Sequence, residues 1–461
     1  MDGGEARFIR TICPYCGVGS GVLALANGVD GVEVKGDPDH PANFGRLCSK
    51  GLALGETVGL QGRLLAPRVH GVDASWDAAL DLVAQKFSAA IATHGPESVA
   101  FYVSGQLLTE DYYVAHKLMK GFIGSANIDT NSRLCMASSV AGHKRAFGSD
   151  TVPGLYEDLD QADLVVLTGS NLAWCHPVLY QRLVAAKEAR PSMRVVVIDP
   201  RRTATCDIAD LHLAIAPGSD AALFNALLVA IADGGAVDAG YLKHVEGFDA
   251  ALAAARLSDP GMTGHSAADL DAFCDLWTQT EKVVTVYSQG INQSSSGTDK
   301  VNAILNCHLA TGRIGRPGMG PFSVTGQPNA MGGREVGGLA NMLACHLVLE
   351  SPAHRNAVQE FWASPAMADK PGLKAVDMFR AVEDGRIKAL WIICTNPAVS
   401  MPDADRVSRA IAACDFVVVS DMIAETDTTR LADVLLPATG WGEKDGSVTN
   451  SERRISRQRA L

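Results

Sequence analysis

Short apolar runs alternate with helical stretches along most of this chain, and this alternation restricts the possible folds more than any other feature. Runs typical of buried strands are Val99–Val103, Leu164–Leu167, Arg194–Ile198, Leu211–Ile215, Val283–Tyr287, Ala389–Ile393 and Phe416–Val419. Helices are expected between them at about Glu110–Gly121, Val178–Ala189 and Thr298–Leu309. A strand, a polar loop and a helix that repeat in this order are typical of parallel, doubly wound sheets. We therefore expect an α/β fold.

The first sixty residues have a different character. They are rich in Gly, Cys and Pro and show little helical periodicity, so we expect a small separate unit there. With 461 residues the chain is also too long for one ordinary domain. Two later segments, 326–338 and 352–371, lack periodicity and are expected to be a polar loop and a loose connection.

Charge and hydropathy exclude several classes of protein. The net charge is 40 − 51 = −11, which gives no overall affinity for nucleic acid or an anionic membrane. No apolar run reaches the roughly 18 residues that a membrane-spanning helix needs. The segment Met1–Arg10 has no apolar signal core and no twin-arginine pair, so we expect a cytoplasmic protein. In that compartment the 11 cysteines are thiols or metal ligands rather than disulfides.

Three cysteines near the N-terminus have the spacing of a metal site. Cys13 and Cys16 enclose two residues, and Cys48 follows far downstream. A four-iron cluster needs thiolates on a tight loop and another brought in by the fold. Gly17 and Gly19 would let the backbone wrap around such a group. A lone C-x-x-C also fits structural zinc, so the residues alone leave both open.

Polar loops follow four of the expected strands. They carry Gly169, Asn171 and His176, then Asp199 and Arg201, then Gly218 and Asp220, then Gln289, Gly290, Asn292 and Gln293. Parallel sheets bind ligands beyond the carboxyl ends of their strands, where helix N-termini face phosphates. Each loop alone is also a common turn or helix cap. Four such loops in one sheet predict a dinucleotide site, and no G-x-G-x-x-G with a following acid points to NAD.

The segment from Cys13 to Gly51, with the runs Gly36–Pro41 and Phe44–Gly51, resembles the N-terminal cluster domain of the molybdopterin oxidoreductase family. The resemblance extends over nearly the whole chain. It implies a [4Fe-4S] cluster on Cys13, Cys16, Cys48 and a third position that is Ser20 here. A serine oxygen suits the iron of such a cluster less well than a thiolate. It also implies that Lys50 lies between cluster and pterin, and that the polar loops bind molybdopterin guanine dinucleotide.

The resemblance further implies a molybdenum ligand at Cys135. A small buried cysteine on a helix is the ordinary interpretation. However, Asn127, Asp129 and Asn131 precede it, and a stretch this polar is unlike a core segment. A soft thiolate suits molybdenum held by dithiolenes. Met136 follows, where formate dehydrogenases have histidine, and this favours the nitrate reductase branch of the family. Arg334 is similar to the family's arginine at the substrate funnel.

These features lead to one functional expectation with two alternatives. We expect reduction of nitrate to nitrite on molybdenum bis(molybdopterin guanine dinucleotide), with electrons from ferredoxin or a flavoprotein. The alternatives are a formate dehydrogenase-like oxidoreductase and a non-catalytic relative. Ser20 favours the second of these, whereas Cys135 and the four loops oppose it.

The expected domains are an iron–sulfur unit at 8–62, a discontinuous α/β unit at 63–135 with 330–461, and an α/β dinucleotide-binding unit at 136–329. The segment 451–457 resembles a strand-turn segment in the middle of the family's catalytic subunit. The chain is therefore expected to be a fragment or truncated product that lacks the family's C-terminal barrel-like domain.

Overall fold

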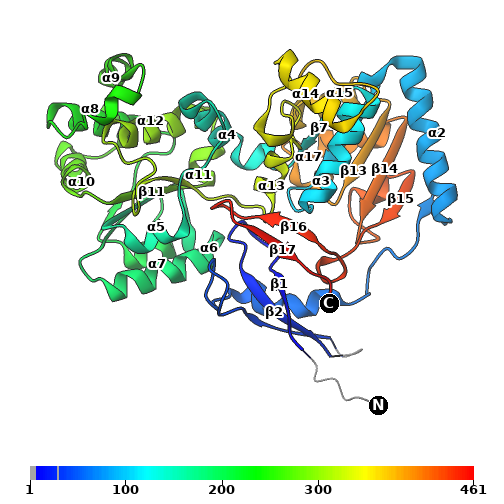
Figure 1. Ribbon diagram of the computed structural model, residues 1–461, viewed down its shortest axis with the longest axis horizontal. Helices are drawn as coiled ribbons and strands as arrows, with labels where there is room; N and C mark the ends of the chain where they lie inside the picture. Colours follow the sequence, from blue (N-terminus) through cyan, green and yellow to red (C-terminus); the bar gives the residue numbers. More distant parts are fainter. Residues whose placement is uncertain (1–6, 28–30) are drawn as a thin grey trace.

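The computed structural model describes residues 7–27 and 31–461. Two α/β lobes stand side by side, and a small N-terminal sheet lies below them (Figure 1). The segment Met1–Arg10 is predicted to lack an export signal, and its first six residues lie outside the described residues. Within the described ranges, no helix is long and apolar enough to cross a membrane.

The N-terminal sheet carries the first two cysteines on one of its turns. Strands β1 (Ile9–Ile12), β2 (Gly21–Ala26) and β3 (Val32–Gly36) pair antiparallel in the order β1-β2-β3. The turn between β1 and β2 contains Cys13, Cys16 and Ser20. A short helix α1 (Ser49–Leu52) begins directly after Cys48 and continues into η2 (Ala53–Val58).

The first lobe is a five-stranded parallel sheet with the order β10-β9-β8-β11-β12. Its strands are β8 (Leu164–Thr168), β9 (Arg194–Ile198), β10 (Leu211–Leu213), β11 (Val283–Tyr287) and β12 (Gly320–Ser323). Its helices are α4 (Arg133–Phe147), α5 (Tyr156–Gln161), α6 (Leu172–Cys175), α7 (Pro177–Ala189), η5 (Ala204–Ile208), α8 (Asp220–Asp233), η6 (Tyr241–His244), α9 (Phe248–Arg256), η7 (Pro260–Thr263), α10 (Ala267–Gln279), α11 (Gln289–Asn292) and α12 (Gly297–Ala310). One buried cluster joins the sheet to α8, α10 and α12, and a second joins it to α5 and α7. Helices therefore cover both faces, which confirms the doubly wound fold.

The second lobe has seven strands in the order β5-β4-β15-β14-β13-β6-β7. They are β4 (Arg68–Val69), β5 (Val72–Asp73), β6 (Val99–Val103), β7 (Ile128–Thr130), β13 (Ala389–Ile393), β14 (Phe416–Asp421) and β15 (Val434–Pro437). The pairs from β15 to β7 are parallel, whereas β4 and β5 are antiparallel. The helices are α2 (Trp76–His94), η3 (Pro96–Ser98), α3 (Thr109–Lys117), η4 (Leu118–Ile123), α13 (Ala330–Glu335), η8 (Ala344–His346), α14 (Pro352–Trp362), α15 (Ala375–Glu383), α16 (Pro397–Ser400), α17 (Ala404–Ala413) and η9 (Thr429–Leu431).

The last residues return to the N-terminal sheet. After η10 (Trp441–Glu443), strands β16 (Gly446–Thr449) and β17 (Ile455–Gln458) form an antiparallel hairpin. The hairpin lies between the two lobes and beside β1 (Figure 1). Thr11 Oγ1 donates to the Arg459 carbonyl at 3.1 Å and accepts from Arg459 N at 2.9 Å. The two ends of the described chain are thus joined directly.

Three sequence expectations were wrong in detail. The segment 326–338 is not all loop, since it contains helix α13, and 352–371 contains helix α14. The Ser351 side chain accepts from His354 N and starts α14, with Pro352 in its first turn. The expected strand 211–215 ends at Leu213. The strands of the five-stranded sheet all lie within 136–329, while the proposed domain boundaries stay a prediction.

Candidate cofactor site

The cysteine loop, residues 13–20 between β1 and β2, is closed by a backbone hydrogen bond between its two ends. Cys13 N donates to the Ser20 carbonyl at 2.9 Å, so Ser20 lies beside the first cysteine and is 5% exposed. The pKa of Cys13 is raised to about 12, mainly by burial and to a smaller extent by Cys16 and Cys48. The Tyr15 backbone N–H and Lys50 oppose this shift. The three predicted thiols, Ser20 and Lys50 therefore share one neighbourhood.

Lys50 lies on the solvent side of these thiols. It is exposed, and its Nζ lies 5.5 Å from the centre of the Tyr15 ring. Burial raises the pKa of Cys16 and of Cys175, at the end of α6, and the charge of Lys50 opposes both shifts. Lys50 is therefore close to both the cysteine loop and α6, and its place between cluster and pterin stays a prediction. In the described part of the chain, no three His, Cys, Asp or Glu side chains are grouped so as to hold a single metal ion.

Two of the predicted loops meet at the centre of the five-stranded sheet. Strands β8 and β11 are neighbours although β9 and β10 separate them in the chain, and the crevice beyond such a reversal is where these sheets bind ligands. Gly290 N donates to the Gly169 carbonyl at 2.9 Å. Gly169 has φ +55, and a Cβ there would lie 2.8 Å from the Gly290 carbonyl carbon. Only glycine fits where the two loops touch.

Buried polar atoms without a protein partner surround this crevice. Among the described residues they include side-chain atoms of Ser132, Thr168, Ser170, His176, Asn292, Thr325 and Gln327. Buried polar groups are almost always hydrogen-bonded in proteins. A polar cofactor that extends along these loops would supply the missing partners, so the residues fit a pterin cofactor.

His176 is prepared to accept a hydrogen bond from such a cofactor. Its Nε2 lies 2.9 Å from the Thr325 carbonyl, which accepts, so Nε2 carries the proton and Nδ1 is an acceptor. Burial lowers the pKa of His176 to about 4, so the ring stays neutral near pH 7. The prediction that His176 belongs to the cofactor site has a geometric basis here.

The other predicted loop residues divide into two groups. Asn171 Oδ1 accepts from Thr205 Oγ1 at 2.9 Å, and Gln293 Nε2 donates to the Leu134 carbonyl at 2.9 Å, so both fix neighbouring loops. Asp199 accepts from Arg201 N at 2.8 Å, while the Arg201 side chain is exposed.

Asp220 is paired with a lysine, and its role in cofactor binding stays a prediction. Its carboxylate lies 2.6 Å from Lys300 Nζ, and both side chains are buried. It opens helix α8 as a partner of that lysine, next to Gly218 with φ +93. A buried carboxylate that already has a cation is a weaker ligand for a further group.

Cys135 lies where several of these segments converge. It is 5% exposed in the first turn of α4, and Gln289 Nε2 lies 3.5 Å from its sulfur. A Cβ at Gly326 would lie 3.3 Å from the same sulfur, so the loop after β12 passes close by. Met136 follows with φ −135 and ψ 21, which bends the helix directly after the cysteine. The predicted metal ligand is thus at the crevice and not in a remote core.

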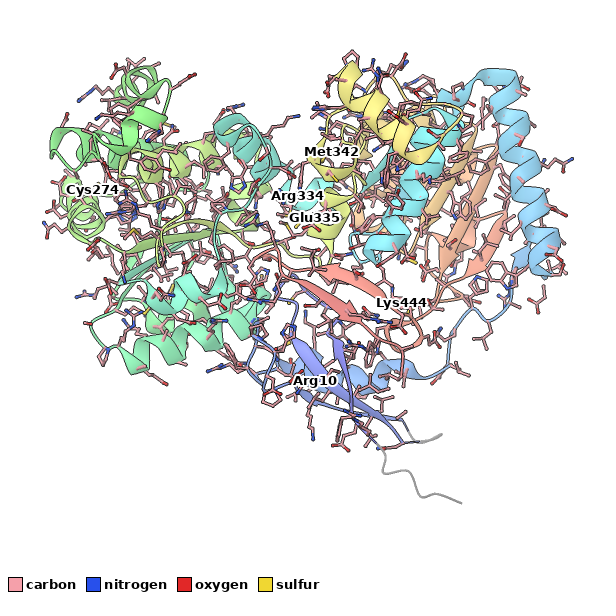
Figure 2. The ribbon with its side chains drawn as sticks, in the orientation of Figure 1. Arg10, Cys274, Arg334, Glu335, Met342 and Lys444 are labelled. Atoms are coloured by element: carbon pink, nitrogen blue, oxygen red, sulfur yellow. The ribbon has the colours of Figure 1, made fainter. Side chains whose placement is uncertain are left out.

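Arg334 is brought close to Met136 but is not open to solvent. It is 2% exposed on α13; its Nε donates to Asp150 Oδ2 at 2.7 Å, and its Nη2 donates to the Asp150 carbonyl at 2.6 Å. His346 pairs with the other carboxylate oxygen. The third nitrogen, Nη1, lies 3.1 Å from Met331 Sδ and 3.9 Å from Met136 Sδ. Arg334 and Glu335 lie at the centre of the molecule, between the lobes (Figure 2).

A second cavity was missed by the sequence reasoning. It measures about 410 Å³, and it is bounded by Cys13 and Tyr15, by Gln106 after β6, by Cys394 after β13 and by Asp421 at the end of β14. Lys444, labelled in Figure 2, also lines it. Strands β6 and β13 are neighbours although far apart in the chain, so this is the corresponding crevice of the seven-stranded sheet. The polar run that follows Ala389–Ile393, Cys394 to Pro397, was the signal that could have revealed it.

Comparison with known proteins agrees with this geometry. Residues 63–461 match the family Molybdopterin oxidoreductase, and residues 6–59 match the Molybdopterin oxidoreductase Fe4S4 domain. The chain belongs to the molybdopterin oxidoreductase family. The resemblance inferred from Cys13–Gly51 is therefore confirmed, and the C-x-x-C pair lies in an iron–sulfur domain of this family.

Several curated relatives carry the name nitrate reductase. The protein from Klebsiella oxytoca is 57% identical over 98% of this chain, and the protein from Shewanella frigidimarina is 51% identical over 98%. The chain spans about half the length of these two relatives, 52% and 50%. Among solved structures, acetylene hydratase from Pelobacter acetylenicus matches with a TM-score of 0.78 at 20% identity, over 97% of this chain and 66% of that one. This last likeness confirms the fold.

Proposed function

We propose that this chain is the cofactor-holding part of a molybdenum enzyme that reduces nitrate to nitrite. The observation that carries the proposal is Cys135, a buried thiol directly followed by Met136 at the meeting point of the loops after β7, β11 and β12. Membership in the family and two relatives named nitrate reductase support it.

The pterin cofactor would be held by both crevices. We infer that one guanine dinucleotide lies along the β8–β11 crevice, where it meets Gly169, Gly290 and His176. A second would lie in the cavity beside Cys394 and Asp421. Molybdenum, bound to the pterins, would supply two-electron oxygen removal from the substrate.

The chain's own residues would orient and protect this reaction. Cys135 would be the protein ligand of the metal, with its sulfur fixed by the Gln289 amide. Arg334 would be the positive group nearest a site for a small anion, with its plane held by Asp150 and His346 and its Nη1 on Met331 Sδ beside Met136. Burial of these groups excludes water and strengthens each interaction with the anion.

The electron path would enter at the cysteine loop. Cys13, Cys16 and Cys48 would bind an iron–sulfur cluster of the four-iron type, left less complete by Ser20 at the remaining position, and Lys50 would lie between this cluster and the pterin. We further infer a ferredoxin or flavoprotein as donor and a cytoplasmic location, on the resemblance alone.

Viologen-coupled nitrite formation tests the function. The parent chain, loaded anaerobically, should form nitrite from nitrate and should not oxidise formate. Cys135→Ala should lose more than tenfold, over about 1.4 kcal/mol of barrier. Cys274→Ala is the matched control, because Cys274 is another buried cysteine in the core formed around α10. Equal activity of the two variants would remove Cys135 from the site, and formate oxidation would favour the formate dehydrogenase-like alternative.

A further inference from the structure

Two backbone carbonyls of the cysteine loop accept hydrogen bonds from buried donors on other segments. The Gly17 carbonyl accepts from Ser451 N at 2.8 Å, from Ser451 Oγ at 2.9 Å and from the Tyr156 hydroxyl at 3.0 Å. The Val18 carbonyl accepts from the same hydroxyl at 3.1 Å and from Asn450 Nδ2 at 3.1 Å. These donors come from α5 and from the turn between β16 and β17, more than a hundred residues away in the chain.

The donors are themselves fixed. Tyr156 and Ser451 are fully buried. Ser451 Oγ accepts from Thr325 N at 3.0 Å, which ties the turn to the loop after β12. Glu452 accepts from Tyr156 N at 2.9 Å and from Arg454 Nε at 2.8 Å. A network in which each buried polar group has its partner is rigid.

The orientation of these carbonyls determines where the neighbouring N–H groups point. In a trans peptide the C=O and the next N–H point in opposite directions. With the Gly17 carbonyl turned toward Ser451, the Val18 N–H points away from that turn, into the loop that carries Cys16. Gly19 has φ +66, and a Cβ there would lie 2.6 Å from the Asn450 Cβ, so loop and turn are in close contact.

We propose that Tyr156 and Ser451 are positioning residues for the iron–sulfur cluster: by fixing the Gly17 and Val18 carbonyls they direct the Val18 N–H toward the cluster sulfurs, and so set the cluster's reduction potential and retention. This inference rests on the cluster of the proposed function. Hydrogen bonds to the sulfurs are a main determinant of such potentials. An N–H on a sulfur stabilises the more negative, reduced state, so loosening it lowers the potential.

Tyr156→Phe and Ser451→Ala test the proposal in the full chain. Tyr156→Phe keeps the ring against Phe322, whose centroid is 5.7 Å away, and removes only the hydroxyl. Tyr102→Phe is the control, since Tyr102 is also fully buried but donates to Met401 in the other lobe. Each protein is reconstituted anaerobically with iron and sulfide, and the cluster is followed by an EPR-monitored redox titration and by iron release to a chelator.

Both variants should show a lower potential and faster iron release than the parent, and Tyr102→Phe should match the parent. Reduced cluster loading in the two variants but not in the control would also support the positioning role. A loaded cluster with unchanged potential and release in both variants would overturn it. A parent chain that takes up no cluster would refute the iron–sulfur part of the proposed function, and the positioning role with it.

Discussion

The ion pair between Arg334 and Asp150 gives the most quantitative prediction. Both side chains are 2% exposed, and the Nε–Oδ2 distance is 2.7 Å. Removing one partner from a buried pair leaves an uncompensated charge and costs about 3–5 kcal/mol. Asp150→Ala should therefore lower the free energy of unfolding by about this amount. The double variant Asp150→Ala, Arg334→Met should regain much of the loss, because no unpaired charge remains.

Urea denaturation followed by tryptophan fluorescence and circular dichroism measures these differences. Asp299→Ala is the control, because Asp299 pairs with Arg145 at 2.8 Å while 71% of its side chain is exposed. Exposed pairs contribute within about 1 kcal/mol. If Asp150→Ala costs no more than Asp299→Ala, the pair does not hold α13 in place and the account of Arg334 is wrong.

The same pair predicts a dependence on pH. Burial alone would raise the pKa of Asp150, but Arg334 and His346 hold it well below its usual range. A carboxylate with a lower pKa in the folded than in the unfolded chain stabilises the fold above the unfolded value of about 3.9. This contribution is lost as the pH falls below that value. Asp150→Ala should flatten the stability curve in this acidic range, and a parallel curve for parent and variant would contradict it.

Three further changes have clear expectations. Lys50→Met should slow electron delivery from cluster to molybdenum in stopped-flow traces with both cofactors loaded; unchanged rates would make Lys50 only a solvated charge. Ser20→Cys should raise iron and sulfide content and give a four-iron EPR signal where the parent holds a less complete cluster, and a stable four-iron parent cluster would refute this. Lys120→Met should destabilise the fold in urea by several times the roughly 1 kcal/mol of one net hydrogen bond, since its fully buried amino group donates to the carbonyls of Gly337, Leu339 and Met342; a change below that value would contradict it.

Much of the fold could be predicted because its strands are buried on both faces. The runs Arg194–Ile198 and Val283–Tyr287 coincide with β9 and β11, where nearly every side chain is buried. Continuous β-branched runs of this length are distinctive in sequence. The order of the strands in each sheet is set by long-range packing, and it could not be read from the runs themselves.

Helix α13 shows why other elements were missed. Its sequence is rich in glycine and has no helical periodicity, so local propensity opposes a helix. Tertiary contacts stabilise it instead: Asn329 Nδ2 donates to the Leu107 carbonyl at 2.7 Å, and the Tyr112 ring packs against Gly333. Such contacts across more than two hundred residues leave no local pattern.

The sequence identified candidate residues of the site but not the residues that they contact. Cys135, Met136 and the loops after β8 and β11 could be named from short motifs. The partners of these residues, Gln289 for Cys135 and Asp150 for Arg334, are 154 and 184 residues away in the chain. The support of the cysteine loop by Tyr156 and Ser451 is of the same kind, because only the folded chain brings the three segments together.

Metal and pterin analysis of the anaerobically purified chain tests the central claim most directly. The parent chain should contain molybdenum and a pterin that releases guanine nucleotide on hydrolysis, together with iron and sulfide. Cys135→Ala should change the molybdenum EPR signal and leave the iron signal intact. Iron without molybdenum or pterin in the parent chain would contradict the account and favour a non-catalytic relative of the family.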